Sequence, residues 1–262
     1  MKIRMFAAAI GLGLVVAISS AVAGEKEVDV SEVNAGIGND LYYPAHPIVL
    51  KNDPNKRPFN GIVKKWHSNK VGGRLAFEVV VEDGLAIEMT TYYDQPTLTK
   101  ETEQTLEDGV RELKTYHRNG ALKSEERYLV PQDRSNTKKD GVFKSYHDNG
   151  NPDQVETFVD GAREGPFKRY DKKGNIAEEY MMKAGKKHGL LTEYYANGQI
   201  KKTEEYVEGY QDGVRTDYSD KGVLRSTQEF KKGRPDGAKV TYENDGKTVK
   251  ATQMFEEGRP VN

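Results

Sequence analysis

Three histidines directly follow an aromatic residue, as Trp66-His67, Tyr116-His117 and Tyr146-His147. Imidazole is a frequent metal ligand, so this recurrence raises the question of a shared metal site. If the three dipeptides occupy equivalent places in successive β-hairpins, they lie two strands apart, about 9 to 10 Å. A bond from nitrogen to a metal such as zinc is only about 2.1 Å long. We therefore expect histidines at the rim of a sheet and predict no metal site.

Pairs of carboxylates could in principle perform general acid and base catalysis. They are Glu125-Glu126, Glu178-Glu179, Glu204-Glu205 and Glu256-Glu257. Lysines accompany them throughout the chain, which is typical of cross-strand charge pairing on a solvated face. The sequence has no GxSxG, HExxH, Walker-type or dinucleotide-binding motif in the required context. We predict that the protein is not an enzyme and binds no cofactor; a glycan-active enzyme is the alternative.

Aromatic residues are the third source of candidate chemistry. A tyrosine recurs every 24 residues, at Tyr146, Tyr170, Tyr194, Tyr218 and Tyr242. These rings could form a stacking platform for glycans, peptides or single-stranded nucleic acid, or they could be the core of a one-sided sheet. Identical spacing in each unit is what packing between units requires, so we favour the core. Recognition is expected at residues that differ between units, and the possible partner-binding residues are Phe143, Phe167 and Leu191.

Glycines recur with the same period and indicate the elements that position these side chains. They are Gly141, Gly165, Gly189, Gly213 and Gly237, and, in a second series, Gly150, Gly174, Gly198, Gly222 and Gly246. In the unit 189–212, two strand-like segments flank Asn197-Gly198, a strong signal for a hairpin turn. A GxxxG segment, from Gly209 to Gly213, is expected to reverse the chain into the next unit, with its glycines at positive φ. The regular units are 141–164, 165–188, 189–212, 213–236 and 237–262.

Weaker copies of the unit begin near Gly61, Gly84 and Gly109, so we expect seven or eight units within residues 59–262. Residues 131–139 form a polar loop insertion between two of them. Residues 24–58 contain four prolines and no clear period, and we predict a tether and a cap that covers the exposed edge of the first hairpin. The predicted fold is all-β: an elongated, single-layer antiparallel meander of tandem 24-residue β-hairpins. It would have about 14 strands and span roughly 65 Å at the usual strand spacing.

The first 23 residues are typical of a signal peptide. Lys2 and Arg4 precede an apolar run, and Ala21-Val22-Ala23 supplies a cleavage site before Gly24. The absence of cysteine excludes disulfides, a thiolate nucleophile and a lipid-modified cysteine. We therefore expect an exported protein, periplasmic or secreted, without a lipid anchor.

The charge and hydrophobicity of the chain limit its partners. The formal net charge is −1, and removal of Lys2 and Arg4 makes it only slightly more negative. So small a charge gives no reason to expect nucleic acid as a partner, and it disfavours attraction to a membrane surface. With 31% charged and 35% hydrophobic residues, the chain is polar for its length. A repeat array suits this composition, because each unit buries its apolar face only against its neighbours.

The unit Gly-(x)4-Tyr-Tyr-x-Asn-Gly-x-(Ile/Leu)-(x)5-Tyr-x-x-Gly resembles the bacterial MORN-variant repeat of the YwqK family of antitoxins. The resemblance covers roughly residues 59–260. It implies a β-hairpin array, and the family name implies neutralisation of a toxin by binding. Eukaryotic proteins with the repeat are scaffolds, for which lipid binding has also been proposed.

The sequence thus leads to three hypotheses about function. The first is an exported, non-enzymatic repeat scaffold that binds a protein partner, including antitoxin-like neutralisation. The second is adhesion at the cell surface or association with membrane lipid, which the weak charge and the lack of an amphipathic helix disfavour. The third is the glycan-active enzyme, disfavoured because no catalytic cluster is unique in the sequence.

Overall fold

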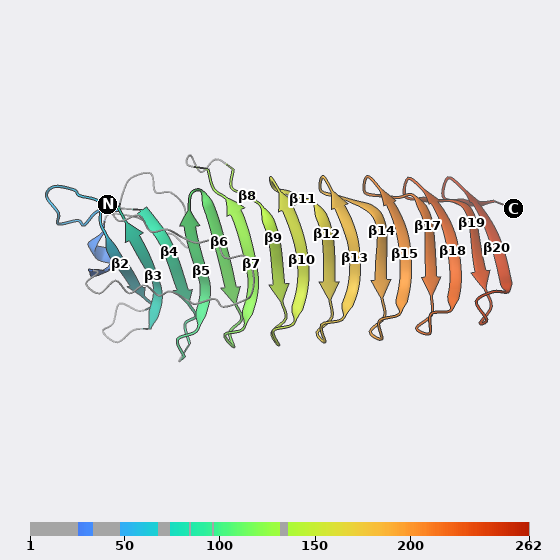
Figure 1. Cartoon of the computed structure of the whole chain (residues 1–262), viewed down its shortest axis with the longest axis horizontal. Helices are drawn as coiled ribbons and strands as arrows, with labels where there is room; N and C mark the ends of the chain where they lie inside the picture. The colour runs from blue at the N-terminus through green and yellow to red at the C-terminus, as the bar shows by residue number, and fades with distance from the viewer. Residues whose placement is uncertain are drawn as a thin grey trace, which may run out of the picture.

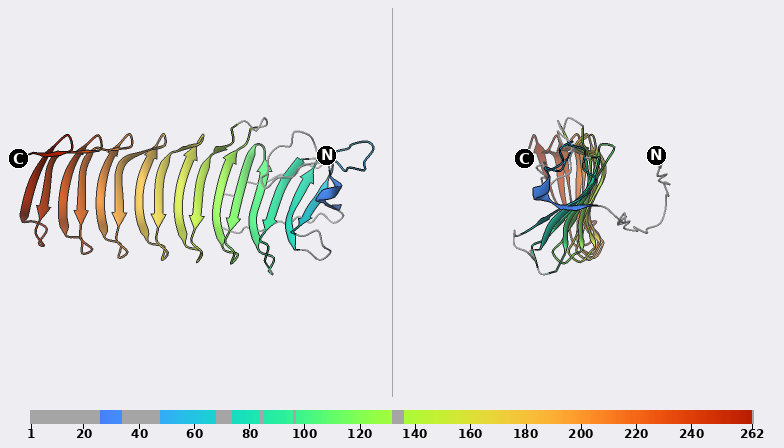
Figure 2. Two further views of the ribbon diagram at one scale, coloured as in Figure 1. Left: turned by 180° about the vertical axis from the view of Figure 1, so that it is seen from behind. Right: turned by 90° about the vertical axis from the view of Figure 1, so that its left-hand side faces the viewer.

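The computed structural model describes residues 26–33, 48–67, 74–83, 85–95, 97–131 and 136–261. They form one open sheet of 21 strands, in which successive long strands pair and all pairings but one are antiparallel. The strands lie side by side along the long axis of the molecule, with β2 near one end of the array and β20 at the other (Figure 1). Viewed from one end, the strands are bowed (Figure 2). The predicted all-β meander of hairpin repeats is confirmed.

Each unit of the array is a hairpin of two long strands. The pairs are β2 (Gly61–Trp66) with β3 (Leu75–Glu82), β4 (Leu85–Tyr92) with β5 (Lys100–Glu107), β6 (Val110–Tyr116) with β7 (Leu122–Leu129), β9 (Gly141–Tyr146) with β10 (Pro152–Val159), β12 (Gly165–Tyr170) with β13 (Ile176–Lys183), β14 (Lys186–Tyr194) with β15 (Ile200–Val207), β17 (Gly213–Tyr218) with β18 (Leu224–Lys231) and β19 (Arg234–Tyr242) with β20 (Val249–Glu256). The short strands are β1 (Glu27–Asp29), β8 (Lys138–Lys139), β11 (Ala162–Arg163), β16 (Tyr210–Gln211) and β21 (Arg259–Val261). The eight hairpins supply 16 long strands, and the five short strands bring the total to 21, compared with about 14 expected.

One end of each regular hairpin is a turn that ends in a glycine, at Gly150, Gly174, Gly198, Gly222 and Gly246. At Asn197-Gly198 the Tyr195 amide donates to the carbonyl of Gln199 at 2.8 Å, and the Gly198 amide donates to the carbonyl of Tyr195 at 2.9 Å. Gly198 has a φ of 82°, and the pairing register shifts by one residue beside the turn. This is a three-residue loop in which a type I turn ends in a glycine bulge. The positive φ predicted for Gly198 is confirmed.

The opposite end of each hairpin differs from the sequence-based prediction. Glu208 and Gly209 have φ values of 51° and 88°, as a two-residue type I′ turn requires. This turn alone reverses the chain. Beyond it, β16 continues to pair with β15, and Gly213 begins β17 with a φ of 124°. The GxxxG segment is therefore a tight turn followed by a bulge, and only its first glycine belongs to the reversal.

Side chains alternate between the two faces of each strand, so the pairing register assigns them to faces. We call the face that carries Phe143, Phe158 and Leu191 the core face, and the face that carries Tyr146 and Tyr194 the open face. The core face has the most buried apolar side chains of the regular array, which are Phe143, Phe158, Phe167, Met182 and Leu191.

Contacts between neighbouring side chains bury the core face, since the described residues form no second layer over it there. The rings of Phe143 and Phe158 meet edge to face with centroids 4.8 Å apart. The Lys139 ammonium lies 4.6 Å from the centroid of Phe143 and 4.9 Å from that of Phe158, close enough for cation–π attraction to both rings. The core of the regular array is therefore thin, and among the described residues its buried apolar side chains extend as far as Leu191.

The N-terminal segment packs against the first hairpins. β1 pairs in parallel with β2, and a 3₁₀ turn, η1 (Val30–Glu32), follows it. Val28, Val33 and Ile48 are buried in one cluster with residues of β2, β3, β4 and β5. A methyl group on Gly61 would lie 2.2 Å from the carbonyl oxygen of Lys26, so only glycine allows β1 this close. This packing covers the side chains of the first strands.

Several sequence-based predictions fall on residues that the structure does not describe. They are the signal peptide at 1–23, residues 68–73 of the weaker copy that begins near Gly61, and parts of the N-terminal segment and of the loop insertion. Within the described ranges, no helix has the length and apolar character needed to cross a membrane.

Candidate binding site

In several hairpins, the residue that follows the aromatic residue at the end of the first strand binds the next hairpin. The Nε2 atoms of His67, His117 and His147 lie 3.0, 2.9 and 3.2 Å from the carbonyl oxygens of the next repeat tyrosines along the array. A carbonyl oxygen only accepts, so each Nε2 carries the hydrogen. The hydroxyls of Tyr93 and Tyr195 donate in the same way, at 2.7 and 2.9 Å. The histidines are thus rim residues that connect hairpins. The described residues include no group of histidine and acidic side chains able to hold a metal.

The asparagines of the turns make a second set of connections. The side-chain amides of Asn119, Asn149 and Asn197 donate to a backbone carbonyl of the following turn at 2.9, 2.7 and 2.7 Å. Because two hydrogen bonds join each such pair of turns, this edge of the sheet has a fixed spacing, and side chains near the turns are held in place.

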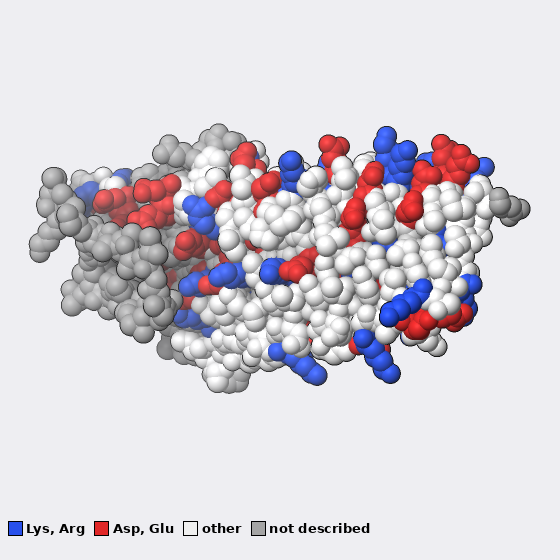
Figure 3. All heavy atoms as spheres, turned by 45° about the vertical axis from the view of Figure 1, so that its right-hand side comes forward, with Lys and Arg blue, Asp and Glu red and all other residues white. Residues whose placement is uncertain are grey.

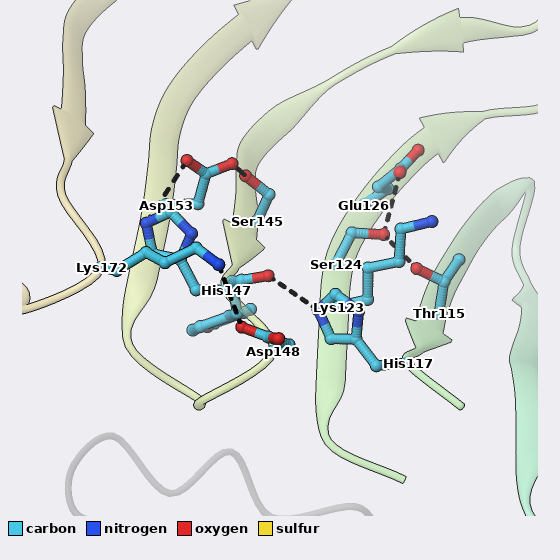
Figure 4. Close-up of a pocket in the computed structure, with 11 residues that line it drawn as sticks. Thr115, His117, Lys123, Ser124, Glu126, Ser145, His147, Asp148, Asp153 and Lys172 are labelled. Carbon is cyan, nitrogen blue, oxygen red and sulfur yellow. Dashed lines mark hydrogen bonds and ion pairs between the residues drawn. The ribbon is translucent and has the colours of Figure 1, made fainter. Parts of the chain in front are cut away.

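A polar pocket opens near this edge on the core face, between the β6–β7 and β9–β10 hairpins (Figure 4). Thr115, Ser124 and Ser145 lie next to one another on paired strands. The hydroxyls of Thr115 and Ser124 are 2.7 Å apart, and Ser124 donates to Glu126 at 3.1 Å. The remaining lining residues include His117, His147, Asp148, Asp153 and Lys172. The pocket therefore offers hydroxyls, carboxylates and imidazoles within a small area.

The pocket geometry does not form a nucleophilic relay. Ser145 donates to Asp153 at 3.1 Å, and Asp153 lies 3.6 Å from Nε2 of His147. Activation of a serine requires the histidine between the hydroxyl and the acid, so that imidazole takes the proton. Here the carboxylate lies between them and the imidazole hydrogen points to the carbonyl of Tyr170. This arrangement suits hydrogen bonding to a ligand.

The pocket hydroxyls belong to a longer row on the core face, which we call the variable row. Adjacent strands pair its members directly, so it crosses the sheet in unbroken register. It consists of Thr91, Thr102, Thr115, Ser124, Ser145, Gln154, Arg169, Glu178, Glu193, Lys202, Asp217, Ser226, Thr241 and Ala251. Hydroxyls dominate its first part and charges its middle, where Lys202 contacts Glu193 at 2.8 Å. Most members are half-buried and reachable from solvent.

A second row lies at the middle of the open face, and we call it the open-face row. It consists of Lys64, Glu78, Thr90, Glu103, Lys114, Glu125, Lys144, Val155, Lys168, Glu179, Thr192, Thr203, Thr216, Thr227, Val240 and Thr252. Lysine and glutamate predominate up to Glu179. Beyond that residue the row has only threonine and valine.

Tyrosine hydroxyls bind the glutamates of the open-face row. Tyr146 donates to Glu125 at 2.8 Å and Tyr194 to Glu179 at 2.6 Å. Burial and the bond to Glu125 raise the pKa of Tyr146 to about 12. The bond to Glu179, followed by burial, raises the pKa of Tyr194 to about 12 as well. Tyr92 and Tyr116 make the same bond, to Glu78 and Glu103.

The structure reverses the roles predicted for the aromatic residues. Phe143, Phe167 and Leu191 are only 5%, 7% and 1% exposed, so they are core residues and offer no surface to a partner. The repeat tyrosines, predicted to be the core, are half-buried on the open face. They lie near the strand ends, where a hydroxyl can remain at the surface or bind a glutamate. The glycine series with Gly150 and Gly198 lies at the turns as expected, whereas the series with Gly141 and Gly213 lies at the start of strands or within them.

Sequence analysis did not identify the pocket or the Tyr–Glu bonds. Ser124, Ser145 and Asp153 match no motif, and only the strand register brings them together. The bonded glutamate precedes Tyr194 by 15 residues and Tyr116 by 13. Because the separation differs between units, the Tyr–Glu pairs can be recognised only once the positions of the bulges are known.

Comparison with known proteins identifies the repeat. The family model described as the MORN repeat variant matches three tandem segments, residues 139–160, 163–184 and 187–208. A search of curated proteins finds no match. The matched segments contain the repeat tyrosines Tyr146, Tyr170 and Tyr194 and the turn glycines of their hairpins. This part of the chain therefore consists of tandem repeats of the MORN variant type.

Proposed function

We propose that the protein is exported and acts as a non-enzymatic scaffold that binds a protein partner along its core face. The variable row is the main support. Backbone turns, glycines and inter-hairpin hydrogen bonds recur from unit to unit, whereas the variable row changes from hydroxyls to charges and back. A regular frame with one changing row suits recognition of an extended surface, to which several hairpins contribute.

The pocket is the place where such a partner would insert a polar side chain. Ser145, Asp153 and His147 offer donors and acceptors at fixed positions, because the turn connections hold the two hairpins together. Neutralisation of a toxin outside the cytoplasm would be one form of this binding, in line with the resemblance to the YwqK family. Export is proposed from the signal-like residues 1–23.

Substitutions borrowed from other units test this proposal with little risk to folding. Arg169 occupies the place of Ser145 in the next unit, so Ser145→Arg suits the fold while it fills the pocket. The control is Lys144→Thr on the open face of the same strand, where a later unit has Thr192. Mature protein and both variants are used as bait in pull-downs from the native cell envelope, with thermal unfolding measured in parallel.

We expect Ser145→Arg to lose a specifically retained protein at an unchanged melting temperature, and Lys144→Thr to retain it. Retention of the same protein by both variants, or its loss from both, would contradict a core-face site.

A further inference from the structure

The open-face row changes character at β14, and this change separates two halves of the open face. In the face shown in Figure 3, red and blue side chains alternate across the middle of one half, and a mostly white surface continues across the other. In the pairing register, Thr192 pairs with Thr203, Thr203 with Thr216, and Thr216 with Thr227. Four threonines therefore stand side by side on adjacent strands, about 4.8 Å apart. Val240 and Thr252 extend this threonine strip.

The hydrogen bonding of each repeat tyrosine depends on the neighbouring member of the open-face row. Each tyrosine stands beside a member of the open-face row on the preceding long strand. Where that member is a glutamate, the tyrosine hydroxyl binds it. Where it is Val155, Thr203 or Thr227, the hydroxyls of Tyr170, Tyr218 and Tyr242 have no hydrogen-bond partner among the described residues. Tyr218 and Tyr242 thus leave their hydroxyls available to a ligand beside the threonine strip.

The repeat tyrosines lie along one border of the threonine strip, and aliphatic and acidic side chains lie along the opposite border. Leu190 and Val214 are 53% and 38% exposed on the open face. They pair with Glu205 and Glu229 on the neighbouring strands, and both glutamates are exposed. An acidic border repels phosphate groups, so it opposes nucleic acid and anionic lipid as ligands.

We propose that this half of the open face binds an extended, uncharged β-1,4-linked glycan chain that runs across the strands, along the axis of the array. Threonine and tyrosine hydroxyls both donate and accept, as sugar hydroxyls do. Tyr218 and Tyr242 lie two strands apart, about 10 Å, which is close to the length of one disaccharide in an extended chain. Their rings would contact alternate sugars while threonine hydroxyls bind the edges between them.

This site is independent of the protein-binding site on the core face, since it uses other residues on the opposite face. An exported scaffold with both sites would hold its partner against a cell-wall or extracellular polysaccharide. The proposal also explains why uncharged residues replace Lys and Glu at six successive positions of a strongly charged protein.

The test measures sedimentation of the mature protein with purified peptidoglycan sacculi, chitin and crystalline cellulose, and titration with chitohexaose. An α-linked glucan, amylose, is the geometric control, because its curved chain cannot follow a straight row. The first variant is Tyr218→Ala with Tyr242→Ala. The second, Thr216→Val with Thr227→Val, keeps the shape of each side chain, and Val240 shows that the row accepts valine. Thr90→Val, in the charged half of the same row, is the control.

We expect retention by at least one β-1,4-linked glycan and none by amylose. Affinity should fall about tenfold or more in the tyrosine variant and severalfold in the threonine variant, with Thr90→Val unchanged. The threonine variant should keep the wild-type melting temperature, so its loss of binding cannot be attributed to unfolding. The proposal is overturned if the wild type binds no β-linked glycan, if it binds amylose equally, or if the threonine variant and Thr90→Val bind as the wild type does. Binding only to anionic vesicles would also overturn it.

Discussion

Removal of one tyrosine hydroxyl should destabilise the protein at Tyr194 and have little effect at Tyr218. The Tyr194 hydroxyl donates to Glu179 at 2.6 Å, and a bond to a charged group is worth about 1.5 to 3 kcal/mol. Glu179 is partly exposed and keeps an ion pair with Lys168 at 3.3 Å, so its charge is not left unpaired. We therefore expect the lower end of that range, a loss of about 1.5 kcal/mol in Tyr194→Phe.

The matched control is Tyr218→Phe, at the same repeat position two strands along. The member of the open-face row beside Tyr218 is Thr203, in the place that Glu179 has beside Tyr194. The Tyr218 hydroxyl has no hydrogen-bond partner among the described residues. Its removal should change the free energy of unfolding by no more than about 0.5 kcal/mol. Urea unfolding of the three proteins, monitored by circular dichroism, measures both values.

The pH dependence gives a second readout of the same bond. The bond to Tyr194 holds the pKa of Glu179 below its ordinary value of 4.5, so this stabilisation is present above that value and is lost as pH falls through the lowered pKa. The pKa of Tyr194 is raised from 10.0 to about 12, so the stabilisation is lost as pH rises across that interval. The difference in stability between wild type and Tyr194→Phe should be constant between about pH 5 and pH 10 and shrink on both sides. Equal losses at Tyr194 and Tyr218, or a difference that does not vary with pH, would refute the assigned bond.

The remaining predictions concern the turns, the core and export. Gly198→Val should cost about 1 to 3 kcal/mol because valine is strained at positive φ, and Lys201→Val should cost little; equal shifts in thermal unfolding would contradict the turn. Phe143→Ala should cost about 3 kcal/mol as a core truncation, whereas Val142→Ala on the open face should cost less than about 1 kcal/mol; the reverse order in urea unfolding would invalidate the assignment of faces. Mass spectrometry of protein recovered outside the cytoplasm should find an N-terminus at or near Gly24, and an intact Met1 would contradict cleavage.

The sequence was sufficient to predict the repeat, the hairpins and the conformation of the turn glycines, because each depends on local residues. Gly198 belongs to a series of glycines that recur every 24 residues, and its positive φ after Asn197 needs no tertiary information. The faces were harder to predict. A bulge beside each turn shifts the alternation of side chains, so the period that aligned Tyr194 with Tyr218 could not tell which face the tyrosines occupy.

The candidate site depends on pairings between hairpins, which sequence periodicity does not reveal. Ser124 and Ser145 are separated by an insertion that interrupts the 24-residue step, and only the sheet register shows that they are neighbours. The prediction that recognition lies at residues that differ between units remains a proposal. It now applies to Ser145 and the variable row, because Phe143 is buried.

The most direct test of the account is a series of deletions of whole 24-residue units, such as Gly189 to Asp212, assayed for folding and for retention of the partner identified with the wild type. Each deletion joins equivalent points of two units and keeps the turns, bulges and faces in register. If the protein is an extended binding scaffold, every shortened protein should fold and its affinity for the partner should weaken in steps as units are removed. If one deletion instead abolished a substrate-consuming activity that its neighbours left intact, the protein would be an enzyme and the scaffold account would be wrong.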